Sequence, residues 1–206
     1  MKTALALCGL LLLPSQLMAA TPFKENVSSI IDWSVKKTWK IKAAPLDFAI
    51  SFDKKKIFVL EKDNKVHLYS NSFNGDRIGT IPVAPSTVAF DIAPRGGMLY
   101  LVGSDKTYTA IKITFDKNGG SIADWSVQNT WKTDTRPLDI AQTFDKKFAF
   151  VLEKDNKVHV YSIAGKRRGT VPAAPDTVAI AIPSRKKTLH FVGRNKTYKA
   201  IRLSLF

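Results

Sequence analysis

The chain has 206 residues, of which 45% are hydrophobic and 24% charged, and this is the composition of an ordinary folded globular protein rather than a disordered one. Lysine and arginine number 32 against 17 aspartate and glutamate, so the formal net charge is +15. This imbalance says nothing about the fold. It favours an anionic partner, such as an acidic protein, an anionic glycan or a lipid head group.

Residues 1–20 have the pattern of a secretory signal peptide. Lys2 provides the positive start, an apolar run of about ten residues follows, and Ala19 and Ala20 are the small residues of a cleavage site. A membrane-spanning helix needs roughly 20 apolar residues, so we expect no membrane span and a periplasmic or secreted mature protein. The only cysteine, Cys8, lies in this segment, so residues 21–206 have no thiol chemistry, disulfide or cysteine-ligated metal.

Residues 21–206 are expected to form a single domain made of two duplicated halves, 29–121 and 122–206. The segment at 32–70 begins DWSVKKTWK and ends FVLEKDNKVHLYS, and it reappears at 124–162 as DWSVQNTWK through FVLEKDNKVHVYS. Further along, LVGSDKTYTAIKI at 101–113 returns as FVGRNKTYKAIRL at 191–203. Internal repetition of this kind is typical of repeat architectures.

Each half divides again into two units of three alternating strands. The strand segments are rich in Val, Ile, Phe and Tyr, and the turns between them are rich in Asp, Asn, Gly and Lys, as β-hairpins require. A fourth strand follows at residues 77–83, 122–131 and 168–172 in the first three units. The pattern predicts an all-β protein built from four-stranded sheets, with no helix beyond the leader.

The fourth unit starts near Pro175 and ends at Phe206 after only three predicted strands. Its missing strand is present at the other end of the chain, at residues 31–39, which duplicate the fourth strand of the second unit. Propellers close their ring in this way, and each unit has the length of one blade, about 40–45 residues. The sequence therefore predicts a four-bladed β-propeller closed by its N-terminal strand, or alternatively half of an eight-bladed ring shared by two chains.

The stretches FDKKKIFVLEKDNKVHLYS and FDKKFAFVLEKDNKVHVYS resemble the bacterial YVTN/NHL-like β-propeller repeats. The resemblance extends over residues 29–206. It implies a propeller scaffold and no particular activity, because a fold of this kind hosts many functions.

All four tryptophans, Trp33, Trp39, Trp125 and Trp131, occur in two W-x5-W pairs. Six residues along an extended strand place both rings of a pair on one face. Exposed rings could stack on a sugar or anchor a protein partner. We expect instead that these rings pack between blades, because large aromatic side chains on alternating strands are usually buried.

The EKDNK sequences at 61–65 and 153–157 are predicted hairpin turns, because Asp and Asn tolerate positive φ and a calcium loop would need more oxygen ligands. His67, His159 and His190 lack the spacing of metal ligands. We expect them to be half-buried strand residues, and no metal is assigned.

No nucleophile elbow, P-loop or dinucleotide fingerprint occurs, so no catalytic residue and no cofactor is assigned. Propeller lactonases and esterases bind a metal through carboxylates in the central channel. Asp47 and Asp139, at the start of equivalent first strands, are the only duplicated acids placed for such a site. They make a metal-dependent, lactonase-like hydrolase the alternative to a non-enzymatic protein.

The positive charge is expected to concentrate on one face of the propeller. The turns from first to second and from third to fourth strands share that face, whereas the opposite face is close to neutral. The predicted binding residues of the basic face are Lys54, Lys55, Lys56, Lys146, Lys147, Lys166, Arg167, Arg168, Arg185, Lys186 and Lys187. Such a face attracts anions, with screening over roughly 8 Å, although lysine-rich turns are also common simply as soluble turns.

The sequence thus favours an exported, non-enzymatic binding or scaffold protein that docks an anionic partner on its basic face. The expected partners are an acidic protein or an anionic envelope glycan or lipid, and the eight-bladed alternative adds a homodimer. Nucleic acid is not an expected partner, because an exported protein meets little of it and no RNA-stacking motif occurs.

Overall fold

The structure is a computed structural model that describes residue 41 and residues 43–71, 75–93, 97–183 and 188–204. These residues form strands and turns, and no helix among them is long and apolar enough to cross a membrane. The expected signal peptide at 1–20 and the expected closing strand at 31–39 lie outside the described residues. The prediction of an all-β chain is confirmed.

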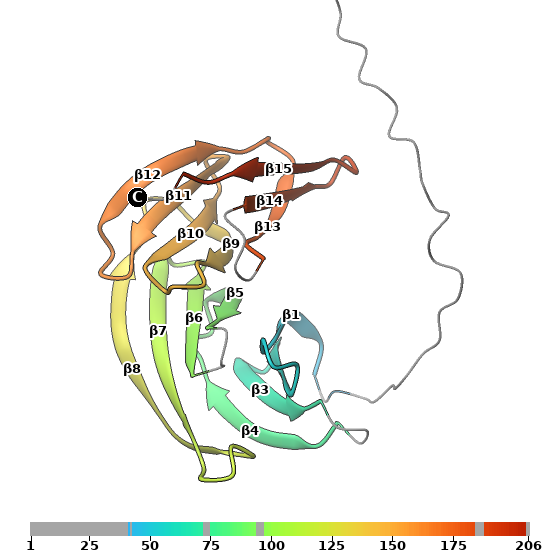
Figure 1. Cartoon of the computed structure of the whole chain (residues 1–206). Coiled ribbons are helices and arrows are strands. Elements are labelled where there is room, and N and C mark those ends of the chain that lie inside the picture. The colour runs from blue at the N-terminus through green and yellow to red at the C-terminus, as the bar shows by residue number, and fades with distance from the viewer. Residues whose placement is uncertain (1–40, 42, 72–74, 94–96, 184–187, 205–206) are drawn as a thin grey trace, which may run out of the picture. The chain divides into compact units, whose positions relative to one another are not determined.

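Four antiparallel sheets, the blades, follow one another along the chain (Figure 1). Blades 1 and 2 contain β1 (Pro45–Ile50), β2 (Lys56–Glu61), β3 (Lys65–Ser70), β4 (Arg77–Pro82), β5 (Thr87–Ile92), β6 (Met98–Gly103), β7 (Thr107–Phe115) and β8 (Ile122–Lys132). Blades 3 and 4 contain β9 (Pro137–Gln142), β10 (Phe148–Glu153), β11 (Lys157–Ser162), β12 (Arg167–Pro172), β13 (Thr177–Ala181), β14 (Thr188–Gly193) and β15 (Tyr198–Arg202).

The strands of each blade are ordered as the chain runs, and the inner strands β1, β5, β9 and β13 contact one another in succession. This is the arrangement of a four-bladed β-propeller, as predicted. The fourth strands of the first three blades fall where the sequence placed them, and blade 4 has three described strands.

The hairpin turns form where the sequence predicted them. The first and last residues of each EKDNK sequence pair across the turn. Asn64 and Asn156 both have φ of 59°, the left-handed conformation that asparagine tolerates better than most residues. The same turn residues therefore fix the strand register in blades 1 and 3.

Apolar side chains fill the three interfaces between consecutive blades. Successive residues of a strand point to opposite faces of its sheet, so each middle blade packs one face on the preceding blade and the other on the next. Phe58 and Leu101 belong to the cluster between blades 1 and 2. Tyr108 belongs to the cluster between blades 2 and 3, and Phe150 and Phe191 belong to the cluster between blades 3 and 4.

The edges of blade 4 and blade 1 that lie beyond these interfaces form what we call the blade 4–blade 1 seam. Tyr198 of β15 is 64% exposed, although its duplicate Tyr108 in blade 2 is 0% exposed. Phe48 of β1 is 66% exposed, whereas its duplicate Ile140 in blade 3 is 3% exposed. In the described part of the chain, no apolar cluster joins blade 4 to blade 1.

Candidate functional site

The carboxyl ends of the four inner strands meet around one cavity of about 390 Å³. Residues from β1, β5, β9 and the end of β13 all line it, so the turns that follow these strands gather at the same end of the blades. Within each antiparallel sheet, the turn between the third and fourth strands lies at that end too. The shared end is the face that the sequence predicted to be basic.

Two turns at this end repeat the same sequence, and we call them the FDKK turns (residues 52–55 and 144–147). In the first, the Ser51 hydroxyl donates to Asp53 Oδ1 at 2.6 Å, and the Lys55 N–H donates to the same oxygen at 3.0 Å. The hydrogen bond from Ser51 and the neighbouring lysines hold the pKa of Asp53 below its ordinary value. The ionised carboxylate therefore fixes the turn, and its lysine side chains remain exposed.

The second FDKK turn has the same construction. The Thr143 hydroxyl donates to Asp145 Oδ1 at 2.7 Å, and the Lys147 N–H donates to that oxygen at 3.1 Å. Lys54 and Lys146 occupy the left-handed position of the two turns, with φ of 58° and 62°. Blades 1 and 3 thus present matching pairs of lysines beside the cavity.

The remaining predicted basic residues differ in their surroundings. The Lys56 ammonium lies 4.7 Å from the centre of the Phe115 ring, and Arg167 pairs with Asp134 in the connection between blades 2 and 3. Lys166 and Arg168 are exposed. Arg185, Lys186 and Lys187 lie outside the described residues.

Three lysines at the opposite end of the blades have acidic partners, whereas Lys62, Lys106, Lys154 and Lys196 there form no ion pair among the described residues. The ammonium groups of Lys65 and Lys157 each lie 3.4 Å from an aspartate of their own turn, and that of Lys132 lies 3.8 Å from Asp105. Among the described residues, none of the four FDKK-turn lysines forms an ion pair within 4 Å. The two FDKK turns thus place four exposed lysines, which have no acidic partner in the described part of the chain, next to the phenylalanines that line one cavity.

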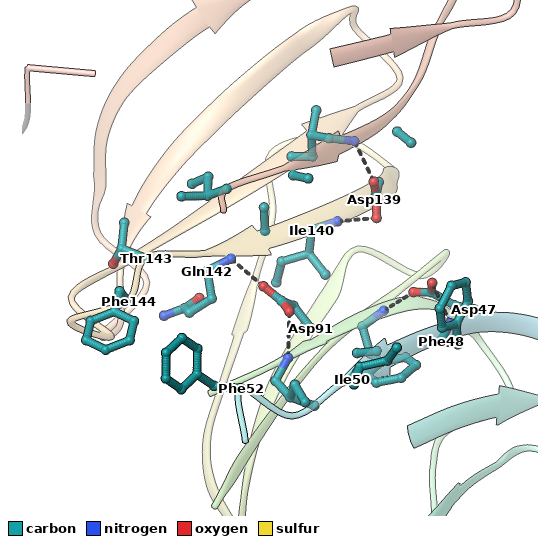
Figure 2. A pocket seen from close by; sticks show the side chains of 18 residues that line it. Asp47, Phe48, Ile50, Phe52, Asp91, Asp139, Ile140, Gln142, Thr143 and Phe144 are labelled. Atoms are coloured by element: carbon teal, nitrogen blue, oxygen red, sulfur yellow. Dashed lines mark hydrogen bonds between the residues drawn. The ribbon is translucent and has the colours of Figure 1, made fainter. Parts of the chain in front are cut away.

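An aromatic pair lies between the two FDKK turns. Phe52 and Phe144 come from blades 1 and 3, their ring centres are 6.2 Å apart, and the rings meet edge to face at 73°. Both line the cavity, and they are 48% and 42% exposed. Figure 2 shows the two rings at one end of the cavity, with the carboxylates of the inner strands beyond them.

Three carboxylates line the cavity: Asp47 and Asp139, which the sequence singled out, and Asp91, which it did not (Figure 2). Asp47 Oδ2 accepts the N–H of Phe90 at 2.9 Å, so the side chain links blade 1 to blade 2. Asp91 Oδ2 accepts the N–H of Gln142 at 2.7 Å and links blade 2 to blade 3.

Asp139 Oδ2 accepts the N–H of Ile180 at 2.7 Å and links blade 3 to blade 4. The other oxygen of each aspartate accepts the N–H of the residue that follows it in the chain. The residue of blade 4 that duplicates Asp91 is Ala181, which has no carboxylate that could accept a hydrogen bond from blade 1. The three aspartates therefore serve as blade-to-blade links.

Burial changes the acidity of these groups. Removal from water raises the pKa of Asp91 to about 7 and that of Asp139 to about 7, against the lowering effect of their backbone hydrogen bonds. Burial also raises the pKa of Asp47. In the part of the chain that the structure describes, no group of three potential metal ligands includes any of these acids, so the geometry adds no ligand to the hydrolase alternative.

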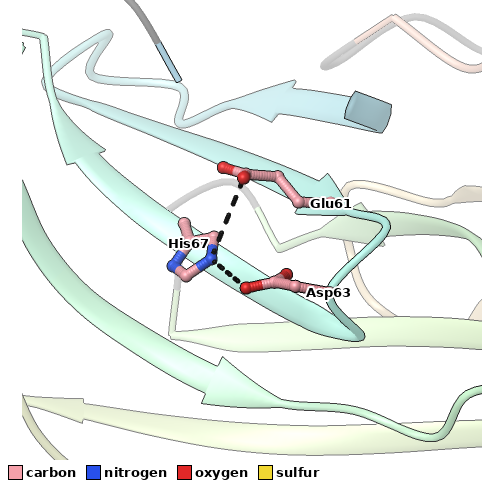
Figure 3. A group of neighbouring side chains, drawn as sticks. All are labelled: Glu61, Asp63 and His67. Atoms are coloured by element: carbon pink, nitrogen blue, oxygen red, sulfur yellow. Dashed lines mark hydrogen bonds and ion pairs between the residues drawn. The ribbon is translucent and has the colours of Figure 1, made fainter. Parts of the chain in front are cut away.

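A different cluster, in blade 1, brings three potential ligand atoms within 4.8 Å of one another: Glu61, Asp63 and His67 (Figure 3). His67 Nε2 lies 3.0 Å from Asp63 Oδ2, and its Nδ1 lies 3.0 Å from the Thr80 hydroxyl. Glu61 accepts the Tyr69 hydroxyl at 2.9 Å. Each member already has a protein partner, so the cluster locks the β2–β3 turn against β4.

Blade 3 repeats this cluster with Glu153, Asp155 and His159. His67 and His159 are fully buried, not half-buried as expected, because both ring nitrogens of each have hydrogen-bond partners and can leave water at little cost. His190 is half-buried, as predicted. Glu61 and Glu153 were predicted only as the first residues of hairpin turns, and their burial was missed.

The prediction that a W-x5-W pair shares one face is wrong for β8. Trp131 pairs with Tyr108 and Trp125 with Ile113, and a bulge between these pairs leaves Gln128 without a partner in β7. One extra residue reverses the alternation of side chains. Trp131 therefore packs between blades, as expected, but Trp125 is exposed. Trp33 and Trp39 lie outside the described residues.

No protein-family model and no curated protein matches this chain, so the resemblance to YVTN/NHL-like repeats has no further support. Solved propellers do match. The β-propeller domain of Myceliophteria thermophila Cps50 (Swd1) is 6% identical with a TM-score of 0.60, covering 76% of this chain and 50% of that one.

The structure of U3-55K is 15% identical with a TM-score of 0.59, covering 80% of this chain and 50% of that one. The RRP9 WD40 repeats are 13% identical with a TM-score of 0.57, covering 80% of this chain and 52% of that one. This chain spans about half the length of these WD40-like propellers. At such identities the likeness shows the fold alone, which is a β-propeller.

Proposed function

We propose that this chain is a non-enzymatic protein-interaction scaffold that docks an acidic partner on the FDKK turns. The observation that carries the proposal is the pair of matched turns whose four lysines are exposed and form no ion pair among the described residues. The WD40-like fold supports an interaction role, because propellers of this kind present their turns as binding surfaces. Export through residues 1–20 to the periplasm or the outside belongs to the same proposal.

An acidic protein suits this surface, because it can contact the lysines with its carboxylates and the exposed aromatic rings between them with apolar side chains. A lipid head group would contact the lysines alone, whereas a sugar of an anionic glycan could also stack on the two rings. These two remain outcomes of the binding test.

The test compares two variants that carry the same change in charge. The first reverses the FDKK lysines (K54E/K55E/K146E/K147E), and the control reverses four lysines in turns at the opposite end (K62E/K106E/K154E/K196E). The control is matched in backbone strain, because Lys106 and Lys196 have φ of 68° and 66° in the same left-handed region as Lys54 and Lys146.

Binding of immobilised poly-glutamate, heparin and anionic phospholipid vesicles is measured at low and high salt. We expect the FDKK variant to lose poly-glutamate binding at least tenfold more than the control does, and we expect added salt to weaken wild-type binding. Equal losses in the two variants would overturn the proposal. Exclusive binding of heparin or vesicles would replace the protein partner by a glycan or a lipid.

The hydrolase alternative predicts a bound metal near Asp47 and Asp139. Metal analysis of the purified protein and melting curves with Ca²⁺, Mn²⁺ and Zn²⁺ test it. Stoichiometric metal that is lost on substitution of Asp139 by Asn would favour the hydrolase over the scaffold.

A further inference from the structure

The side-chain carboxamide of Gln142 forms no hydrogen bond with the described residues. The residue is 5% exposed, and among the described residues neither its side-chain oxygen nor its side-chain nitrogen has a hydrogen-bond partner. A buried polar group normally finds such a partner, and leaving one unpaired costs stability. The blade itself does not require the amide, because the duplicate position in blade 1 is Ile50.

The carboxamide lies in the cavity at the end where the aromatic pair closes it. Gln142, Phe52 and Phe144 all line the cavity, and in Figure 2 the side chain of Gln142 extends toward the two rings. The apolar side chains of Ile50 and Ile182 also line the cavity. Because both polar atoms of the carboxamide are buried, a group that enters from the FDKK end meets apolar surface first and reaches the donor and acceptor once the side chains at the mouth move aside.

The charges around the cavity restrict the chemistry of the ligand group that can enter it. The exposed lysines of the FDKK turns attract anions to the rim, but Asp47, Asp91 and Asp139 line the interior and repel a carboxylate there. The entering portion is consequently uncharged, and the acidic residues of the ligand remain at the rim. A peptide backbone amide offers a donor and an acceptor that complement the carboxamide of Gln142.

We propose that the cavity mouth binds an acidic peptide segment through one large apolar anchor residue. The anchor side chain packs on Phe52 and Phe144, the backbone amide beside it exchanges hydrogen bonds with Gln142, and flanking acidic residues lie against the lysines of the FDKK turns. This inference rests on the proposed scaffold function and specifies the partner segment that it recognises.

The experiment uses the full-length chain and synthetic peptides that are acidic on both sides of a central residue. That residue is leucine or phenylalanine in the anchored peptides and serine or glycine in the controls. Fluorescence anisotropy measures each affinity. We expect the anchored peptides to bind the wild-type chain about tenfold more tightly than the controls.

Two variants should remove this preference without removing binding. Gln142→Ile introduces the residue of the duplicate position, so the fold should tolerate it, and F52S/F144S alters exposed rings. Val127→Ser, at an exposed apolar residue of β8, is the matched control and should retain the tenfold preference. In a spectrum of side-chain amides, the anchored peptide should shift the Gln142 signal and the serine peptide should not.

Failure of this inference is distinguishable from failure of the scaffold proposal. If wild-type chain binds all peptides equally, or if both cavity variants keep the preference, the anchor site is wrong although charge-dependent docking stands. Absence of binding by any peptide also overturns it. If the FDKK lysine reversal leaves peptide binding unchanged, the electrostatic scaffold itself is wrong.

Discussion

The interface between blades 2 and 3 and the blade 4–blade 1 seam are built from duplicated sequence, yet they differ in the described residues. At the first, the Trp131 ring stacks on Tyr108 with the ring centres 4.1 Å apart, and its centre lies 4.6 Å from that of the tilted Tyr161 ring. At the seam, Tyr198 is exposed, and Ala181 replaces the aspartate that links blades 2 and 3. The sequence of a blade thus specifies the hairpins of that blade. The apolar side chains on its outer faces are buried only where another segment of the chain packs on them.

The duplication indicates which segment covers the seam. Trp39 is the duplicate of Trp131, and Tyr69 is the duplicate of Tyr161. A ring closed by residues 31–39 would therefore place Trp39 between Tyr198 and Tyr69. This part of the predicted fold lies outside the described residues and stays a prediction.

The largest expected effect is the loss of the Trp131 ring. Gly165 fits closely against this ring, because a Cβ on the glycine would lie 2.6 Å from Trp131 Cγ. Trp131→Ala should therefore lower the free energy of unfolding by about 3 kcal/mol, since a stacked ring between two blades is removed and the space cannot collapse easily. Urea denaturation measures the change.

Trp125→Ala is the matched control for Trp131, on the same strand but exposed, and should cost less than about 1 kcal/mol. Equal losses in the two variants would show that the stacked arrangement contributes nothing to the interface. Trp39→Ala extends the comparison to the seam: a closed ring predicts a loss similar to that of Trp131→Ala.

A smaller effect for each group is expected from pH, through the aspartates that link the blades. The pKa of Asp91 and that of Asp139 are raised to about 7, above the value near 3.8 of an unfolded chain. Their stabilising contribution is full below the unfolded pKa and is lost as the pH rises through about 7. Between pH of about 5.5 and about 8, the free energy of unfolding should fall by up to about 2 kcal/mol per group.

Asp91→Asn should reduce this pH dependence by about half, because one of the two links whose pKa is raised to about 7 is removed. Melting curves across the same pH range provide the measurement. An unchanged slope in the variant would assign the pH dependence to other groups.

The smallest effect concerns the link that blade 4 lacks. Ala181→Asp places a carboxylate at the position equivalent to Asp91, where it can accept the N–H of Ile50 as Asp91 accepts that of Gln142. In a closed ring the added hydrogen bond should raise the free energy of unfolding by about 1 kcal/mol. Chemical denaturation detects this gain, and a loss of stability would argue that β13 and β1 are not neighbours.

Much of the fold was predictable because the signals are local and repeated. The EKDNK turns, the alternating strands and the three-strand unit at the end of the chain all follow from turn chemistry and periodicity. The bulge at Gln128 was not predictable, because it depends on how β8 curves over β7. The strand also contains no glycine or proline, the residues that commonly mark a bulge in a sequence.

The candidate site was predictable in part. The FDKK lysines and two of the cavity acids were identified because both halves repeat them. Asp91 and Gln142 escaped notice because their duplicates are Ala181 and Ile50, so repetition gave no signal. A polar residue that replaces an apolar one in the duplicate copy would have been the signal to look for.

Closure of the ring by residues 31–39 stays a prediction, and an engineered disulfide tests it most directly. Thr109 pairs with Thr130 in blade 2, and the duplicate positions are Lys199 and Thr38. Residues paired across antiparallel strands are about 5 Å apart, within reach of a disulfide. The test is therefore the oxidation of a C8S/T38C/K199C chain, followed by mass and mobility measurements with and without reductant.

The account predicts an intramolecular disulfide in a monomeric chain that forms readily and raises the melting temperature. A disulfide that links two chains would instead support the eight-bladed ring. Two cysteines that remain free under oxidising conditions would contradict closure by residues 31–39.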